Sequence, residues 1–183
     1  MKKLLILFFA IGLFSTAAHA QFGVRAGYSS PNFTDFASTD ANPGFHVGAY
    51  YKFGAGFIAL EPGIQYAQKG YKNNAAPGGA TTERLNYIDV PVLLRLNFLP
   101  FLNVFAGPQG SVLVSRSYEE GGDTNTNTDG VKGYDIAGVA GVGANLPLGL
   151  NAQVSYDFGL QNLNYFGQDV KNNVFKISIG YDF

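Results

Sequence analysis

The sequence predicts an all-β fold, an eight-stranded antiparallel up-and-down transmembrane β-barrel preceded by a cleaved signal peptide. Three observations lead to this prediction. The chain begins with an export signal, the remainder alternates apolar with small or polar residues in eight segments, and the connections between these segments are alternately short and long. Together these properties are typical of barrels that cross a membrane with strands.

The first 20 residues have the pattern of a secretory signal. Lys2 and Lys3 precede the apolar run Leu4–Phe14, and Ala18 and Ala20 are the small residues that a signal peptidase requires. This run is shorter than the roughly 20 apolar residues that a spanning helix needs. We therefore expect residues 1–20 to be removed and residues 21–183 to form one barrel domain. The chain has no cysteine, which excludes a lipid anchor at the cleavage site.

The first half of the remaining chain contains four segments in which apolar residues recur at every second position. This period of two indicates strands with one apolar face. Gly44–Phe53 alternates most regularly, because phenylalanine, valine, alanine and Tyr51 share one face while glycine, histidine, Tyr50 and lysine share the other. The four expected strands are Phe22–Ser29, Gly44–Phe53, Ile58–Lys69 and Ile88–Leu96.

The second half contains four further segments of the same kind. Val104–Ser115 and Tyr134–Leu146 alternate more weakly because they are rich in glycine and alanine, whereas Leu150–Phe158 and Phe175–Phe183 alternate regularly. No helix follows the glycines at positions 138, 141 and 143, so they do not form a phosphate-binding loop. We expect these glycines to make room for side chains of facing strands in a narrow barrel.

The connections between the expected strands favour a membrane barrel over a soluble β-sandwich. Outer-membrane barrels have short periplasmic turns and longer outer loops in strict alternation, whereas a soluble sandwich has no reason to sort its loops in this way. We also expect each strand to have about the 9–11 residues that a tilted membrane strand needs. The short connections are 54–55, 98–102 and 147–148, and the long ones are 31–42, 70–83, 116–133 and 161–172.

Composition and the placement of aromatic residues agree with strands that face lipid. The chain is 15% aromatic and only 14% charged, and it has 24 glycines. Aromatic side chains gather at both ends of the expected strands, as they do where amphipathic rings meet lipid headgroups. Those near the long loops are Tyr28, Tyr66, Tyr156 and Phe158, and those near the short turns are Phe53, Phe98, Phe101 and Tyr181.

Several motifs give the chain a resemblance to a known family. The segments are Phe22–Gly27, Leu60–Gly70, Tyr87–Arg95, Phe105–Pro108 and Ile179–Phe183. In these segments the chain resembles the PorT-like outer-membrane β-barrel family along its whole length after residue 20. The resemblance implies a small eight-stranded barrel in the outer membrane and does not specify a task. The chain departs from the family pattern in the seventh strand, where Ser155 stands at a position that is commonly basic.

Catalytic, metal-binding and cofactor-binding signals are poor, and we expect no enzymatic activity, metal or cofactor. After residue 20 the chain has a single histidine, His46, on the expected inward face, where we expect a hydrogen-bonded lumen residue. The segment Asp123–Gly130 has oxygen-bearing side chains at alternate positions, as in calcium loops. The glutamate that closes such loops is absent, because Tyr134 and Ile136 occupy the twelfth positions counted from Asp123 and Asn125.

The charged residues on the inward face form the most informative set. They number five cations and five anions: Arg25, Lys52, Glu61, Lys69, Asp89, Arg95, Asp135, Asp157, Lys176 and Asp182. An eight-stranded barrel is just wide enough for side chains to fill it, and buried charges are costly unless they are paired. We expect a structural network that plugs the lumen, with one shared layer but no assigned pairs, formed by Arg25, Glu61, Asp89, Arg95, Asp157 and Lys176.

Three functions remain open at the level of the sequence. The first is a structural or interaction role in the cell envelope, with the long loops facing a partner, the outer surface facing outer-membrane lipid, and both termini in the periplasm. The second is a narrow channel for small solutes. The third is a soluble periplasmic, lipocalin-like binder of an apolar ligand, which would place the aromatic residues inside.

The C-terminus and the net charge add two expectations about partners. Tyr181 and Phe183 form a terminal pattern of alternating apolar residues that the barrel-insertion machinery would read as an assembly signal. Residues 21–183 contain 10 basic and 13 acidic side chains, a net charge of −3. A nucleic-acid-binding protein would need a basic face, so we expect no such partner.

Overall fold

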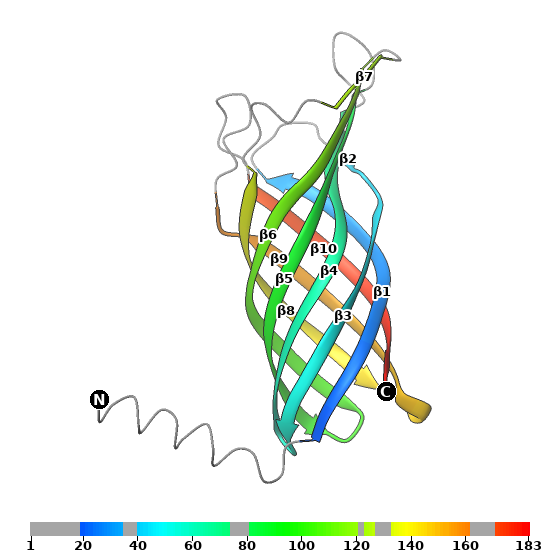
Figure 1. Cartoon of the computed structure of the whole chain (residues 1–183), viewed down its shortest axis with the longest axis vertical. Coiled ribbons are helices and arrows are strands. Elements are labelled where there is room, and N and C mark those ends of the chain that lie inside the picture. Colours follow the sequence, from blue (N-terminus) through cyan, green and yellow to red (C-terminus); the bar gives the residue numbers. More distant parts are fainter. Residues whose placement is uncertain (1–18, 35–39, 74–80, 121–122, 127–132, 162–170) are drawn as a thin grey trace, which may run out of the picture.

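The structure is a computed structural model that describes residues 19–34, 40–73, 81–120, 123–126, 133–161 and 171–183. Antiparallel pairing runs through every pair of consecutive long strands, and the last long strand pairs with the first, which closes the barrel (Figure 1). The predicted eight-stranded barrel is therefore confirmed. Its long strands are β1 (His19–Thr34), β3 (Gly44–Ala55), β4 (Ile58–Asn73), β5 (Thr81–Leu99), β6 (Leu102–Glu120), β8 (Tyr134–Asn145), β9 (Leu150–Gly159) and β10 (Lys171–Asp182).

The two ends of the barrel differ in their connections, as predicted. At one end, Gly56 and Phe57 join β3 to β4, Pro100 and Phe101 join β5 to β6, and a short 3-10 helix, η2 (Pro147–Gly149), joins β8 to β9. Gly56 has a φ of 61°, a left-handed conformation that glycine adopts without steric cost. The first residues of β1 and the C-terminus also lie at this end, the short-turn end (Figure 1).

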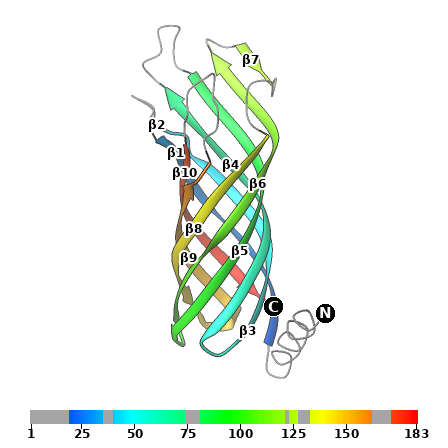
Figure 2. The same ribbon diagram turned by 90° about the vertical axis from the view of Figure 1, so that its left-hand side faces the viewer.

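At the opposite, long-loop end the strands continue further than the sequence predicts. β5 and β6 each have 19 residues, β4 continues to Asn73, and all three project beyond the other strands (Figure 2). Two short strands extend this projection, β2 (Asp40–Ala41) on β4 and β7 (Asp123–Asn125) on β6. The expected bounds of the loops at 70–83 and 116–133 were too wide, because residues 70–73, 81–83 and 116–120 lie in paired strands. Backbone pairing persists there although the alternation of apolar side chains ends, and residues 74–80, 121–122 and 127–132 lie outside the described residues.

The apolar face of each strand points outward and the polar face points into the lumen. On β1, Phe22 and Tyr28 are 46% and 48% exposed, whereas Arg25 is 8% exposed. A soluble binder of an apolar ligand would have the opposite arrangement, so the structure contradicts the lipocalin-like alternative. Among the residues that the structure describes, no helix is long and apolar enough to cross a membrane.

Small residues determine how side chains fill the lumen. A side chain at Gly141 would meet the ring of Phe105, and one at Gly143 would meet Asn103, as the sequence led us to expect. Gly138 differs, because a Cβ there would approach only Leu160, at 3.9 Å, and so would point away from the lumen. Among the described residues, buried polar and charged side chains outnumber buried apolar ones, so the barrel interior is mainly polar. Leu93, Phe105 and Val139 form a small apolar cluster within it.

Candidate functional site

The polar lumen is the candidate site, because the charged residues predicted to face inward all take part in ion pairs there. Each of the ten has an oppositely charged partner within 4.0 Å. The six residues of the predicted network do not form one layer. They divide into two clusters stacked along the barrel axis and a small polar space lies between them.

The cluster nearer the short-turn end, the Glu61 cluster, consists of Arg25, Glu61 and Arg95. Arg95 binds both carboxylate oxygens of Glu61, with Nε 2.6 Å from Oε2 and Nη2 2.9 Å from Oε1. Arg25 Nη1 donates to Oε1 of the same carboxylate at 3.0 Å. The order of the strands brings these residues together. Glu61 lies on β4, Arg95 on the adjacent β5, and Arg25 on β1, which is separated from β4 by β3.

Aromatic and amide groups hold the two guanidinium groups in place. Arg25 Cζ lies 4.0 Å from the centre of the Tyr50 ring, and Arg95 Cζ lies 4.4 Å from that of Phe105. Arg95 also donates to Asn103 Oδ1 at 2.7 Å and to Gln153 Oε1 at 2.6 Å. A planar fork of donors suits this arrangement, since each edge of the group meets a different acceptor.

The second cluster, the Asp89 cluster, consists of Lys69, Asp89, Asp135, Asp157 and Lys176. Asp89 lies between two ammonium groups, at 3.2 Å from Lys69 and 3.4 Å from Lys176. Lys176 also pairs with Asp157 at 2.6 Å, whereas Lys69 lies 3.8 Å from Asp135. Five strands, β4, β5, β8, β9 and β10, therefore contribute one charge each to a single layer.

Between the clusters the lumen is almost filled. Gln65 donates to Asp89 at 3.3 Å and Gln109 donates to Asp157 at 3.2 Å. The cavity that remains there has a volume of about 20 Å³, which is room for one water molecule. His46 lies beside it, 2.9 Å from Ser29 Oγ and 2.8 Å from Ser178 Oγ, so both ring nitrogens have hydrogen-bond partners.

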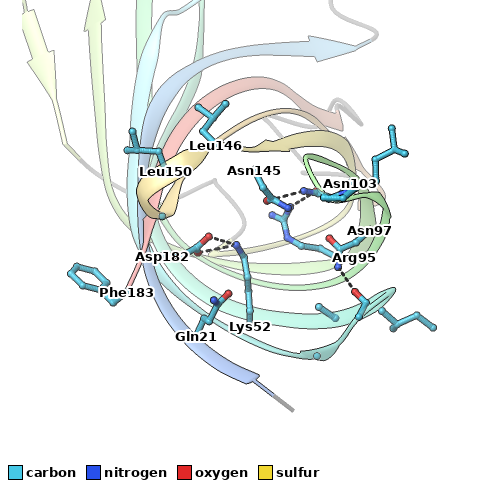
Figure 3. Close-up of a pocket in the computed structure, with 17 residues that line it drawn as sticks. Gln21, Lys52, Arg95, Asn97, Asn103, Asn145, Leu146, Leu150, Asp182 and Phe183 are labelled. Atoms are coloured by element: carbon cyan, nitrogen blue, oxygen red, sulfur yellow. Dashed lines mark hydrogen bonds and ion pairs between the residues drawn. The ribbon is translucent and has the colours of Figure 1, made fainter. Parts of the chain in front are cut away.

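A wider cavity of about 520 Å³ opens at the short-turn end (Figure 3). Lys52 and Asp182 face each other across it, with Nζ 2.7 Å from Oδ2. Tyr50 donates its hydroxyl proton to Asp182 at 2.7 Å and accepts a hydrogen bond from Asn151 at 2.8 Å. Tyr50 therefore links this pair to Arg25, on which its ring stacks.

Sequence reasoning missed a buried ion pair at the long-loop end. Arg116 Nε lies 2.6 Å from Glu83 Oε1, and both side chains are buried. On β5, every second residue before Asp89 faces inward, and this alternation would have placed Glu83 on the inward face. Arg116 could not be found in this way, because a register irregularity opposite Asn86 and Tyr87 shifts the alternation on β6.

The predicted assembly residues lie at the seam where the barrel closes. The backbone N–H of Phe183 donates to Phe22 O at 2.8 Å, and the two rings stack with their centres 5.7 Å apart. Tyr181 pairs with Val24 of β1 and packs edge-on against Phe183.

The chemistry available to the lumen is electrostatic. In the described part of the chain no group of three or more His, Cys, Asp or Glu side chains is arranged to hold a metal ion. Of the calcium-like segment, Asp123–Asn125 forms β7, and residues 127–132 lie outside the described residues. No described arrangement pairs a nucleophile with the single lumen histidine beyond the two serine hydroxyls that it binds.

Comparison with known proteins identifies relatives of the fold. The sequence model of a family described as outer membrane protein beta-barrel domain matches residues 15–165. No curated protein sequence matches the chain. Among solved structures, the chain is similar to Neisserial surface protein A, with a TM-score of 0.63 and 15% identity over 90% of this chain and 99% of that one.

Two further structures extend this comparison. The attachment invasion locus protein Ail of Yersinia pestis gives a TM-score of 0.58 at 16% identity, over 90% of this chain and 99% of Ail. Ail has also been solved in complex with a heparin analogue, sucrose octasulfate. The outer membrane protein OprG of Pseudomonas aeruginosa gives a TM-score of 0.56 at 11% identity, over 91% of this chain and 97% of OprG. At these identities the similarity concerns the fold.

Proposed function

Because the chain belongs to the family of outer membrane protein beta-barrel domains, we propose that it is a structural barrel with a plugged lumen and an interaction surface at its long-loop end. The chain is an outer-membrane protein. The observation that carries the proposal is the pairing of every predicted inward charge across the lumen, with about 20 Å³ left between the two clusters. A lumen filled in this way supports the wall and offers solutes no open path.

The projection of β4, β5 and β6 supports the interaction role. The paired strands β4, β5 and β6 continue beyond the rest of the barrel at the long-loop end, and the buried Glu83–Arg116 pair joins β5 to β6 there. Ail, which shares the fold, binds a heparin analogue. We infer that the long loops of this chain contact an extracellular or envelope partner.

Export and assembly complete the proposal. Residues 1–20 would be removed as a signal peptide, although β1 includes His19 and Ala20 in the structure. The short turns and both termini would then lie in the periplasm. Tyr181 and Phe183 would be read by the insertion machinery as an assembly signal. The more specific assignment to the PorT-like family rests on the sequence motifs given above. The proposal includes no catalytic activity and no cofactor.

Planar-bilayer conductance separates the plugged barrel from the narrow channel. The purified, folded chain should show no discrete conductance steps in a salt solution, while an open porin serves as the positive control. Steady single-channel steps from the unmodified chain would overturn the plug and favour the channel. Fractionation of cells, with protease added from outside, tests the orientation, since only the long-loop end should be cut.

A further inference from the structure

The two lumen clusters carry opposite surplus charges. The Glu61 cluster has two guanidinium groups and one carboxylate, whereas the Asp89 cluster has three carboxylates and two ammonium groups. All eight side chains are at most 8% exposed, so water screens neither surplus effectively. The two surpluses cancel over the whole lumen, but they lie in different layers, so the Asp89 cluster itself holds one carboxylate more than it has cations.

The geometry assigns this surplus to Asp135. Asp89 and Asp157 each have an ammonium group within 3.2 Å or less, but the nearest cation to Asp135 is Lys69 at 3.8 Å. Lys69 is also directed elsewhere, because its Nζ donates to Ser111 Oγ at 3.0 Å and lies 4.6 Å from the centre of the Tyr87 ring. Neither carboxylate oxygen of Asp135 receives a hydrogen bond, although the residue is 1% exposed.

Two further buried oxygens lie in the field of this carboxylate. Tyr87 interacts electrostatically with Asp135, and the Asn172 side chain lies within hydrogen-bonding reach of its carboxylate; the two residues are 0% and 2% exposed. Neither the Tyr87 hydroxyl nor the Asn172 amide oxygen has a hydrogen-bond partner. Buried polar atoms are rarely left unpaired, so the unpaired Asp135 carboxylate and Tyr87 hydroxyl beside one surplus charge point to a bound ligand.

We propose that the Asp89 cluster binds one singly charged cation at Asp135, either a proton or an alkali-metal ion. A proton would turn one carboxylate oxygen into a donor, and an alkali-metal ion would be coordinated by oxygens of Asp135 and Tyr87. A multivalent metal does not fit, because the described residues contain no group of acidic or histidine ligands that could hold one. The charged groups that face the site are Lys69, Asp89, Asp157 and Lys176, and Glu83 also acts on Tyr87.

Thermal unfolding of the full chain, folded in detergent micelles, tests this proposal. Melting would be followed in sodium, potassium and choline chloride at equal ionic strength and across a range of pH. An alkali-metal ion at Asp135 predicts a higher melting temperature in sodium or potassium than in choline. A proton there predicts a melting temperature that falls as the pH rises, because a carboxyl that keeps its proton on folding stabilises the protein only while it stays protonated.

Two matched variants identify the residue responsible. Asp135→Asn should melt no lower than the parent and should lose the dependence on ion or pH. Asp157→Asn removes a closely paired carboxylate, so it should melt roughly 10 °C lower and keep the dependence. Equal destabilisation by both variants, or a parent insensitive to both ion and pH, would overturn the proposal.

Spectroscopy of the parent protein keeps the test decisive if Asp135→Asn does not fold. Carbon-13 NMR of labelled aspartate carboxyls in choline chloride at neutral pH should show one protonated group if the ligand is a proton. Broadening of the sodium-23 resonance by the folded chain should report an alkali-metal ion. The absence of both signals would contradict the assignment.

Discussion

The Glu61 and Asp89 clusters balance buried charge in different ways. In the Glu61 cluster two arginines share one carboxylate, and Arg95 alone makes bonds to Glu61, Asn103 and Gln153. In the Asp89 cluster two lysines are shared among three carboxylates, at distances between 2.6 and 3.8 Å. An arginine fork fixes direction as well as charge, whereas an ammonium group supplies charge with little direction. The comparison shows how one lumen combines a rigid layer with a more adaptable one.

The largest effect is expected where one carboxylate serves two cations. Glu61→Gln would leave Arg25 and Arg95 buried without their anion, and it should lower the free energy of unfolding by about 5 kcal/mol or abolish folding. Heat-modified mobility on gels and thermal unfolding in detergent would measure the loss. A variant as stable as the parent would show that the Glu61 cluster does not support the barrel.

Asp89→Ala should have a somewhat smaller effect, because each of its two lysines has another carboxylate. Lys176 retains Asp157 at 2.6 Å and Lys69 retains Asp135 at 3.8 Å. We expect a loss on the order of 3–5 kcal/mol, at the lower end of this range if Lys69 moves towards Asp135. If Asp89→Ala unfolds at the temperature of the parent, or conducts steadily without loss of stability, the proposal of a plugged lumen is wrong. The alternative of a narrow channel for small solutes then gains support.

Deletion of Phe183 tests the seam at a residue that belongs to neither cluster. The deletion removes one backbone hydrogen bond and two ring contacts, for a loss of about 1–2 kcal/mol in the folded barrel. Its larger effect should be on assembly, measured as the amount of heat-modifiable protein in outer-membrane fractions. Phe183→Tyr, which keeps the ring, is the matched control, and unchanged assembly of the deletion would contradict the signal.

The smallest effect is expected on the outer face of the projection. Arg84 is exposed and follows the buried Glu83 directly. Arg84→Ala should change the free energy of unfolding by less than about 0.5 kcal/mol, as most surface substitutions do. Arg116→Ala provides the contrast, because it leaves Glu83 buried without its ion-pair partner. Equal melting temperatures for the two variants would show that the buried pair adds nothing to stability.

The sequence was sufficient for the barrel and for the division of each strand into an apolar and a polar face, because the period of two is a local property. Which face points outward is decided by the structure, in which the apolar residues are exposed and the charged ones buried. The extent of β5 and β6 could not be predicted, since paired strands above the membrane need no apolar alternation. The register irregularity beside Tyr87 concealed Arg116 for a related reason. Individual ion pairs, such as Arg25 with Glu61, depend on tilt and stagger, which the sequence does not encode locally.

The seam between β1 and β10 has a consequence for chain connectivity. The N–H of Phe183 bonds to the carbonyl of Phe22, so the two ends of the barrel-forming chain lie side by side. The register across this seam continues from Gly23 to Thr34, as regular as between strands joined by a turn. A short linker could therefore join the ends, and the chain could be reopened at a long loop to give a circular permutant. The order of the strands in the gene is one of several that would give the same cylinder.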